Sequence, residues 1–476
     1  MGLILNPEVK LRRDKKRVLI YTLDNFTEQP GEVFFIHPAY AVLLTMFDGQ
    51  KEYLTVLEEF CGMIEQKMNK ESVELIEDQL NLIKNKLKLD KLLLDGSRLI
   101  NSSGYNPEDF IIPVKEVELA PNNPRIDFPL IINLNLTSRC KFECRYCYHP
   151  LEKIDEDLSL ERMGELFDEC KEKGCQFILL SGGDPFERKD ILEIIEMLEE
   201  RGLTYFISTK SYLDKKLCQR LKEVGLLKIQ LSLDTSNPEQ ADWLTGSKPG
   251  FLNKTLETID NLNQVGIRVG IRTVLTGYNI DNLSDFLDFC SNLEIERVQL
   301  VQYMRSIWRH EEGLFPTEEQ LEKANLVIAK YKDKLDRPII EGGNLSVDQI
   351  DNGQGKELFD KRSVCDTCRK SITILPNGEI IICEQLPYHS ETILGDLKEE
   401  SIQEFWNSNR ACQFITPPGR TKYKKDSPCR SCDKDDYQNC HQHYGICIKD
   451  SYQYFGDFKS PDIRCQYVKT NNFRLK

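Results

Sequence analysis

No run of apolar residues in this 476-residue chain is long enough to cross a membrane. Runs such as "FILL" and "KLLLD" are far shorter than the about 20 residues that a spanning helix needs. The first ten residues, "MGLILNPEVK", have neither the basic segment nor the apolar core of a secretion signal. Asn6 also stands where a myristoylation signal has Ser or Thr. We therefore expect a cytoplasmic protein with no membrane partner.

Positive charge is also scarce. The 63 Lys and Arg residues are outnumbered by 77 Asp and Glu residues, which gives a formal net charge of −14. A chain of this sign has no broad basic field to neutralise phosphates, so it argues against nucleic acids and anionic membranes as partners. A neutral or partly cationic substrate is easier to accommodate.

Cysteine, in contrast, is abundant, with seventeen residues. In a reducing cytosol such cysteines are more often metal ligands or catalytic thiols than disulfides. Three fall at 140–147 and nine lie beyond residue 364. Six of the seventeen sit mostly in helical patterns beside apolar residues, and we expect them to be small buried hydrophobes: Cys61, Cys170, Cys175, Cys218, Cys290 and, among the nine beyond residue 364, Cys412. A substrate contact is the alternative for Cys412.

Residues 1–97 predict a small α+β domain. "RVLIYTLD" (17–24) and "GEVFFIHP" (31–38) are strand-like, and three helical patterns follow them. This order of elements is winged-helix-like. Residues 98–129, which contain "NSSGYNPEDF" and "APNNPRIDFP", read as a linker.

Residues 130–330 alternate between strand and helix patterns, which predicts an α/β fold. Helical stretches such as "DILEIIEMLEERG" end in Gly, as helix C-termini often do. Six βα units predict a parallel sheet curved into a partial (β/α)6 barrel, with reactive groups at the C-terminal strand ends. The predicted strands are "LIINLNLT", "QFILLSGG", "TYFISTK", "KIQLSLD", "RVGIRTVLT" and "RVQLVQY".

Residues 345–476 are irregular and cysteine-dense. "SITILPNGEIII" predicts a hairpin around Asn377 and Gly378. The rest has few core-forming runs, and such a segment needs metal staples to be stable.

Cys140, Cys144 and Cys147 form the motif C-x3-C-x2-C directly after the first predicted strand of the barrel. Three thiolates on one loop can bind three corners of a [4Fe–4S] cluster and leave one iron open. A structural zinc site would need four ligands, typically in C-x2-C pairs, so this spacing fits zinc poorly. Three buried core thiols are the remaining alternative.

This motif, with Tyr146 before its last cysteine, resembles the radical S-adenosylmethionine (radical SAM) superfamily. Gly182, Gly183 and Asp184 resemble the Gly-Gly-Glu element that binds the SAM amino group, with Asp in place of Glu. Ser232 and Asp234 match the segment that touches the ribose, and Arg272 stands where relatives contact the carboxylate. Ser208 lies in "STK", where relatives have Thr-Asn-Gly. The resemblance implies an enzyme that cleaves SAM to a 5′-deoxyadenosyl radical.

The tail resembles the SPASM extension, which carries two auxiliary [4Fe–4S] clusters, so the chain would hold three clusters in all. The resemblance implies Cys365, Cys368, Cys383 and Cys447 as ligands of the first. For the second it implies Cys429, Cys432, Cys440 and Cys465, although the spacings around Cys440 and Cys447 depart from the usual block. A pair of zinc sites is the alternative. His441 and His443 are substitute ligands or, as we expect in so polar a stretch, surface residues.

Residues 36–60 of the N-terminal domain resemble the precursor-recognition (RRE) domains of ribosomal peptide modification. In these domains a leader peptide adds a strand to a sheet edge, and "GEVFFIHP" is the expected edge strand. A DNA-binding winged helix and a plain structural cap are the alternatives.

Together the three parts indicate a radical SAM oxidoreductase that matures a ribosomal precursor peptide, with a reducing partner such as flavodoxin or ferredoxin. Formation of Cys-to-carbon thioether links is the leading hypothesis. The alternatives are a carbon–carbon cross-linking peptide cyclase, a sulfatase-type formylglycine maturase, and a non-enzymatic iron–sulfur electron-transfer or peptide-binding protein.

Overall fold

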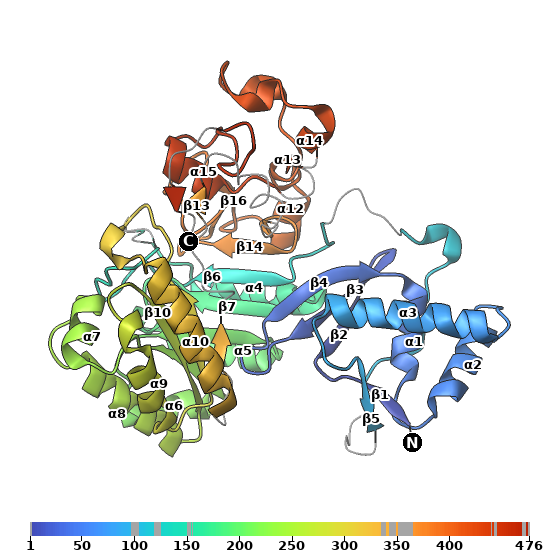
Figure 1. Cartoon of the computed structure of the whole chain (residues 1–476), viewed down its shortest axis with the longest axis horizontal. Helices are drawn as coiled ribbons and strands as arrows, with labels where there is room; N and C mark the ends of the chain where they lie inside the picture. The colour runs from blue at the N-terminus through green and yellow to red at the C-terminus, as the bar shows by residue number, and fades with distance from the viewer. Residues whose placement is uncertain are drawn as a thin grey trace. The chain divides into compact units, whose positions relative to one another are not determined.

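The computed structural model describes residues 2–96, 104–118, 125–149, 154, 156–334, 339–341, 349–350, 365–438, 440–441, 445–468 and 473–474. The chain divides into two compact units, Met1–Asp127 and Phe128–Lys476 (Figure 1). Each unit has its own packed core, and they are described separately below.

The N-terminal unit is built on an antiparallel sheet in the order β2–β3–β4, with β2 at Val9–Asp14, β3 at Arg17–Leu23 and β4 at Pro30–Ile36. Three helices follow: α1 (Pro38–Met46), α2 (Tyr53–Met63) and α3 (Lys70–Lys86). A short pair, β1 (Leu3–Leu5) with β5 (Leu93–Asp95), completes the unit. Asn69 begins α3 through a capping box with Ser72.

The core of this unit lies between the sheet and the helices. Its fully buried members include Ile20, Leu43 and Phe47. Part of the predicted linker joins it: the 3-10 helix η2 (Pro107–Phe110) brings in Phe110, and the Tyr105 hydroxyl accepts a hydrogen bond from the Leu11 amide at 3.0 Å. A second 3-10 helix, η3 (Val114–Glu116), follows.

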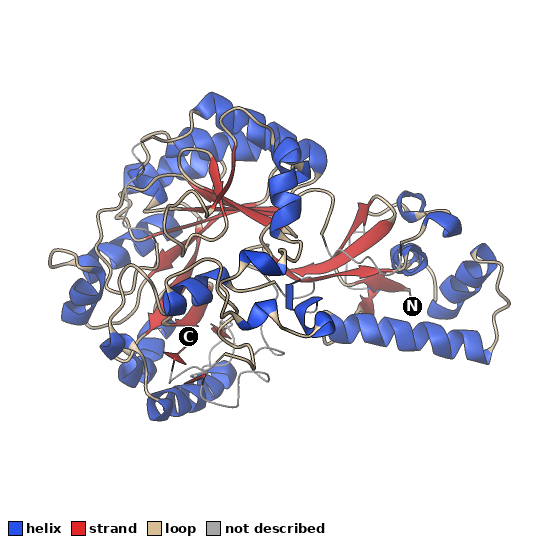
Figure 2. Ribbon diagram, turned by 90° about the horizontal axis from the view of Figure 1, so that it is seen from above, coloured by secondary structure: helices blue, strands red, loops and turns tan. Residues whose placement is uncertain are grey.

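The C-terminal unit contains a ten-stranded sheet in the order β12–β11–β10–β9–β8–β7–β6–β14–β15–β16. Its six central strands are parallel and match the six predicted strands, so the predicted partial barrel is confirmed. They are β6 (Ile131–Asn135), β7 (Phe177–Ser181), β8 (Tyr205–Thr209), β9 (Lys228–Ser232), β10 (Arg268–Leu275) and β11 (Arg297–Gln302). The connecting helices lie outside the curved sheet (Figure 2): α4 (Leu160–Lys173), α5 (Ile191–Arg201), α6 (Lys215–Glu223), α7 (Pro238–Thr245), α8 (Phe251–Gln264), α9 (Leu283–Ser291) and α10 (Glu318–Lys334).

The sheet extends beyond the six predicted strands at both edges. On one side β12 (Ile339–Glu341) pairs in parallel with β11. On the other side β14 (Ser371–Ile374) pairs in parallel with β6, although the two strands are far apart in sequence. The hairpin predicted at Asn377 is formed by β14 and β15 (Glu379–Ile381), and β16 (Ile393–Asp396) adds a further antiparallel strand. The cysteine-rich tail therefore begins inside the same sheet as the barrel.

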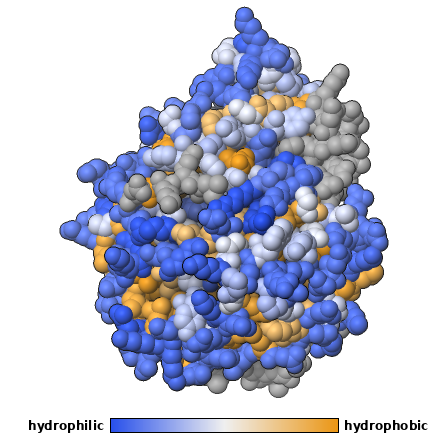
Figure 3. All heavy atoms as spheres, turned by 90° about the vertical axis from the view of Figure 1, so that its left-hand side faces the viewer, coloured by the Kyte–Doolittle hydropathy of each residue, from blue (hydrophilic) through white to orange (hydrophobic). Residues whose placement is uncertain are grey.

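The remaining elements of the tail are short. They are the helices α12 (Ile402–Asn407), α13 (Asn409–Phe414), α14 (Lys434–Gln438) and α15 (Ile448–Phe455), and the strand pair β13 (Gln349–Ile350) with β17 (Phe473–Arg474). Among the described residues, no helix combines the length and the apolar character that crossing a bilayer requires. Figure 3 views the side where α7 and α8 lie, and its apolar areas are small and separated by hydrophilic ones.

The two faces of the barrel sheet differ in chemistry. Side chains of paired residues in parallel strands point to the same face, and successive residues alternate. The face that includes Ile178, Leu180 and Ile207 is apolar and buried. The opposite face carries three pairs of polar residues from neighbouring strands. They are Asn135 with Ser181, Ser208 with Gln230, and Ser232 with Arg272. Polar groups are thus concentrated on the face that the helices do not cover.

Candidate active site and cysteine-rich centres

The loop that carries Cys140, Cys144 and Cys147 follows β6 and is anchored on α7. The Glu143 amide donates to the Thr245 carbonyl and the Arg145 amide to the Leu244 carbonyl, both at 3.0 Å. Gly246, which ends α7 with a φ of +62°, allows this approach, because a Cβ there would lie 2.8 Å from the Glu143 carbonyl oxygen. Cys140 is exposed, Cys144 is buried and Cys147 is half-buried.

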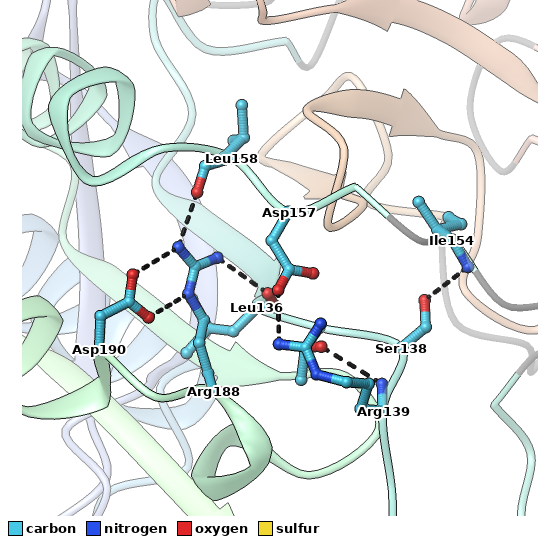
Figure 4. A network of polar contacts seen from close by, with 9 residues as sticks. Leu136, Ser138, Arg139, Ile154, Asp157, Leu158, Arg188 and Asp190 are labelled. Atoms are coloured by element: carbon cyan, nitrogen blue, oxygen red, sulfur yellow. Dashed lines mark hydrogen bonds and ion pairs between the residues drawn. The ribbon is translucent and has the colours of Figure 1, made fainter.

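The segment that leads into this loop is held by two arginines (Figure 4). The buried guanidinium of Arg188 donates to the carbonyls of Leu136 and Leu158 at 3.1 and 2.7 Å, and it pairs with Asp190. Arg139 pairs with Asp157 at 2.7 Å. The first cysteine therefore starts from a fixed backbone.

The predicted Gly182–Gly183 turn packs directly against the same loop. The Gly183 amide donates to the Thr137 carbonyl at 2.7 Å, and the Asp184 amide donates to the Arg139 carbonyl at 2.9 Å. A Cβ at Gly183 would lie 2.1 Å from the Arg139 carbonyl oxygen, and one at Gly182 would lie 2.4 Å from that of Thr137. Both glycines are therefore needed for the backbone approach.

The Asp184 carboxylate joins the ends of β7 and β8. It accepts hydrogen bonds from the Thr209 hydroxyl at 2.7 and 2.8 Å, and from the amides of Lys210 and Phe186 at 3.0 Å. Burial raises the pKa of Asp184, and these hydrogen bonds act in the opposite direction. Its role toward the amino group of SAM stays a prediction.

Tyr146 and Asp234 contact each other. The Tyr146 hydroxyl donates to the Asp234 carboxylate, which also accepts from the Val274 amide at 2.8 Å. Both side chains are buried, and burial raises the pKa of each. The loop is thereby tied to the ends of β9 and β10.

Sequence reasoning missed Lys210, which lies beside this network. Its Nζ is 5.4 Å from the centre of the Tyr146 ring. The ammonium is also within electrostatic reach of all three loop cysteines and of Asp234. The departure of "STK" from the usual Thr-Asn-Gly was the only signal in the sequence.

The other predicted SAM contacts lie on the polar face of the sheet. Ser208 accepts a hydrogen bond from Gln230 at 3.3 Å. Ser232 is half-buried, and its partner Arg272 is exposed. The charge of Arg272 interacts with Glu384 and Tyr148, which hydrogen-bond to each other. Sequence reasoning also missed this Tyr148–Glu384 pair, which brings the residue after Cys147 together with the residue after Cys383.

Two cysteines of the first predicted auxiliary set lie near Lys449. Cys383 follows β15 and Cys447 precedes α15, and both interact electrostatically with Lys449. Cys383 also interacts with Cys365. Cys368 is fully buried and has a φ of +57°. A Cβ at Gly445 would lie 3.5 Å from the Cβ of Cys365. Burial raises the pKa of Cys383 to about 12.

In the second predicted set, Cys429 interacts electrostatically with Cys465 and Cys432. Cys440 shares the neighbours Tyr423 and Tyr437 with Cys429. Burial raises the pKa of Cys429 to about 11. Over the described stretches, no group of three or more His, Cys, Asp or Glu side chains is arranged to hold a single metal ion.

The expectation that His441 is a surface residue was wrong. Only 7% of it is exposed, its ring lies 4.3 Å from that of Tyr437, and its Nε2 is 3.3 Å from the Tyr423 hydroxyl. Arg369 donates to its carbonyl at 3.3 Å. Contacts with aromatic side chains thus bury His441 although its sequence neighbours are polar.

A cavity of about 200 Å³ beside Cys365 is lined in part by Arg369, Tyr423 and His441. His443 lies outside the described residues.

Five of the six other cysteines are buried, which confirms the prediction for Cys61, Cys170, Cys175, Cys218 and Cys290. Cys412 is half-buried, in α13.

Comparison with known proteins decides the class. The radical SAM superfamily model matches residues 134–290, and the model of the SPASM domain, an iron–sulfur cluster-binding domain, matches residues 365–433. The chain contains a radical SAM domain followed by a SPASM domain. It is therefore an enzyme, and its radical SAM domain binds SAM and a [4Fe–4S] cluster.

Solved structures share the fold over nearly the whole chain. The Streptococcus suis protein SuiB bound to S-adenosylmethionine is 15% identical, with a TM-score of 0.60, over 97% of this chain and 100% of that one. SuiB bound to its precursor peptide SuiA is 16% identical, with a TM-score of 0.61, over 97% and 98% of the two chains.

The residues of the radical SAM domain fit the cluster that the family implies. Metal ligation needs thiolates, and Cys140, Cys144 and Cys147 interact electrostatically with one another beside a cation. Burial raises the pKa of Cys144 to about 12, and the charge of Lys210 acts in the opposite direction. In the SPASM domain the assignment of the eight cysteines to two clusters stays a prediction.

Proposed function

We propose that this radical SAM enzyme modifies a ribosomally made precursor peptide and forms Cys-to-carbon thioether links in it. The observation that carries the proposal is the likeness to SuiB along the whole length of both chains, since SuiB is seen bound to a precursor peptide. A match that includes the N-terminal unit favours a peptide substrate over a small molecule.

In this proposal Cys140, Cys144 and Cys147 bind the SAM cluster and leave its fourth iron for SAM. When bound, the cluster and SAM would supply the radical chemistry that removes a hydrogen from the peptide. The chain contributes a rigid cysteine loop, which α7, the Gly182–Gly183 turn and Asp234 hold from three sides. A polar sheet face at the strand ends orients SAM and the peptide.

The SPASM cysteines would bind two further clusters, with four thiolates each. Cys365, Cys368, Cys383 and Cys447 hold the first, and Cys429, Cys432, Cys440 and Cys465 hold the second. With four thiolates each, these clusters would have no open iron for the substrate sulfur and would serve to accept the surplus electron of the reaction. A small electron carrier such as flavodoxin or ferredoxin reduces the enzyme.

Residues 1–97 would bind the leader of the precursor as a winged-helix (RRE) domain. In the described part of the unit, β4 pairs with β3 alone, so its second edge is open to a peptide strand. Lys86 lies 5.2 Å from the ring centre of Phe34, which places the end of α3 beside this strand. The exposed Leu75 and Leu82 of α3 offer apolar contacts to the same peptide.

The test is anaerobic turnover of the reconstituted enzyme with SAM, dithionite and a Cys-containing precursor. Each thioether link removes two hydrogens from the peptide. It also consumes one Cys thiol, which an alkylating reagent then no longer modifies. The same mass loss with unchanged thiol reactivity would establish carbon–carbon links and overturn thioethers. Formation of an aldehyde, with release of hydrogen sulfide from Cys or loss of two hydrogens from Ser, would point to a formylglycine maturase.

Leader recognition is tested separately. Removal of residues 1–127, at the boundary between the compact units, should abolish turnover of the precursor while SAM cleavage continues. Undiminished peptide turnover by the truncated enzyme would overturn a leader-binding role for the N-terminal unit.

A further inference from the structure

Lys210 extends from a fixed point at the end of β8. Its amide donates to Asp184 Oδ2 at 3.0 Å, and the Thr209 hydroxyl bonds to both oxygens of the same carboxylate. The Ser211 amide returns to Thr209 Oγ1 at 2.9 Å. These bonds fasten the backbone of Lys210 to the Gly-Gly-Asp turn, so the side chain starts from a fixed position beside the cysteine loop.

The side chain of Lys210 points toward the cysteine loop. It is half-buried, and its Nζ lies 5.4 Å from the centre of the ring of Tyr146, the residue before Cys147. The charge of its ammonium interacts with those of Cys140, Cys144, Cys147 and Asp234.

The loop's own cations are engaged elsewhere. Arg139 pairs with Asp157 at 2.7 Å, Lys141 with Glu187 at 2.6 Å, and Arg145 with Glu311 at 2.8 Å. Arg309 donates to the Cys144 carbonyl at 3.1 Å and so holds the backbone. The groups that surround the charge of Lys210 include the thiols themselves.

A [4Fe–4S] cluster held by three thiolates carries net negative charge, and one-electron reduction adds to it. A nearby cation stabilises the reduced state more than the oxidised state, because the Coulomb energy grows with the charge of the cluster. We propose that Lys210 is an electrostatic residue of the SAM site that makes the bound cluster easier to reduce. This inference rests on Cys140, Cys144 and Cys147 being the cluster ligands.

The test is the reduction potential of that cluster in the full-length, reconstituted protein. Dithionite supplies the one electron, and electron paramagnetic resonance (EPR) follows the reduced signal. The signal that changes when SAM is added identifies the SAM-binding cluster among the three. Lys210→Met removes the charge and keeps the apolar stem, whereas Lys210→Arg keeps the charge. Lys216→Met, at an exposed position on α6, is the matched control.

We expect Lys210→Met to disfavour reduction by about tenfold, which is about 59 mV for a one-electron couple. In Lys210→Arg and Lys216→Met the equilibrium constant for cluster reduction should stay within about twofold of that of the parent protein. This difference is well below the effect expected from removing one unit charge near the cluster. A Lys210→Met protein with the full iron content and an unchanged potential would overturn the proposal. So would a Lys210→Arg protein whose potential falls as far as that of Lys210→Met.

Two further measurements keep the test decisive. If Lys210→Met does not assemble its clusters, Lys210→Gln is titrated in its place under the same criteria. Failure of the ligand assignment has a different signature, because Cys144→Ala would then retain the SAM-sensitive EPR signal. Loss of that signal in Cys144→Ala, together with a shifted reduction potential in Lys210→Met, supports both the ligand assignment and the electrostatic role of Lys210.

Discussion

The loop at 140–147 and the tail at 365–465 both concentrate cysteine, but the fold holds them differently. The loop sits on a barrel of regular strands and helices, and backbone hydrogen bonds fasten it to α7 and to the Gly182–Gly183 turn. The tail continues from β16 into helices of only five to eight residues. In the radical SAM domain the scaffold therefore positions the thiols, whereas in the SPASM domain we expect the bound clusters to stabilise the scaffold.

The largest effect should follow from removing a thiol of the loop. Cys144→Ala should abolish formation of 5′-deoxyadenosine, measured by chromatography after anaerobic incubation with SAM and dithionite. Because the barrel holds the loop, the melting temperature should change by less than about 4 °C. Cys170→Ala, a buried cysteine of α4, is the control and should retain SAM cleavage. Full cleavage by Cys144→Ala would remove the distinction between the two regions.

A thiol of the tail should behave in the opposite way. Cys383→Ala should abolish peptide modification but leave uncoupled SAM cleavage, because the barrel keeps its own cluster. Loss of a metal staple should also expose the tail to limited proteolysis, read by mass spectrometry, with cuts between residues 365 and 468. Chelation of iron from the parent protein should produce the same cuts. If the tail resists the protease after iron has been removed, its own packing is enough to keep it folded, and the bound clusters are not needed for its stability.

Gly183→Ala should have an intermediate effect. Its new Cβ would lie 2.1 Å from the Arg139 carbonyl oxygen, so the turn and the cysteine loop must separate. We expect a loss of about 1–3 kcal/mol in the free energy of unfolding, as for other overpacked sites, together with weaker SAM binding. Gly313→Ala is the control, since neither Gly313 nor Gly183 has a positive φ and no atom lies within 4 Å of the new Cβ at Gly313. Equal SAM affinity in the two variants would contradict the role of the turn.

The smallest effect is expected from Tyr146→Phe. It removes the hydrogen bond to the Asp234 carboxylate but keeps the ring beside Lys210. An intramolecular hydrogen bond contributes about 0.5–1.5 kcal/mol, so the melting temperature should fall by a few degrees at most while the cluster still assembles. Calorimetry and iron analysis measure the two quantities. Loss of the cluster in this variant would mean that the bond, and not the backbone, positions the loop.

Much of the barrel was predictable because its signals are local. The six strands, and the glycines that end α4 and α5 at positions 174 and 202, follow from short-range patterns. The C-x3-C-x2-C motif was readable because its thiols lie within eight residues of one another. The contact between Gly183 and Arg139 was not readable, since it depends on how closely β6 and β7 place their following turns.

The tail shows where sequence reasoning fails. His441 was expected at the surface because its neighbours are polar, yet Tyr423, Tyr437 and Arg369 bury it from distant positions. Likewise nothing in the sequence pairs β14 with β6, because that register joins residues about 240 positions apart, as Asn133 and Thr373 show.

The sequence by itself determined the composition of the two cysteine groups, the order of the barrel strands and the resemblance to radical SAM and SPASM domains. Only the tertiary structure decided which charge lies beside the thiols. Lys210 reaches the cysteine loop because the parallel strands β6 to β9 end at one edge of the sheet, where Tyr146, Asp184 and Asp234 also lie. Electrostatic contacts depend on distance in space. Cys144 and Lys210, which are 66 positions apart in the chain, come near each other only once the sheet has formed.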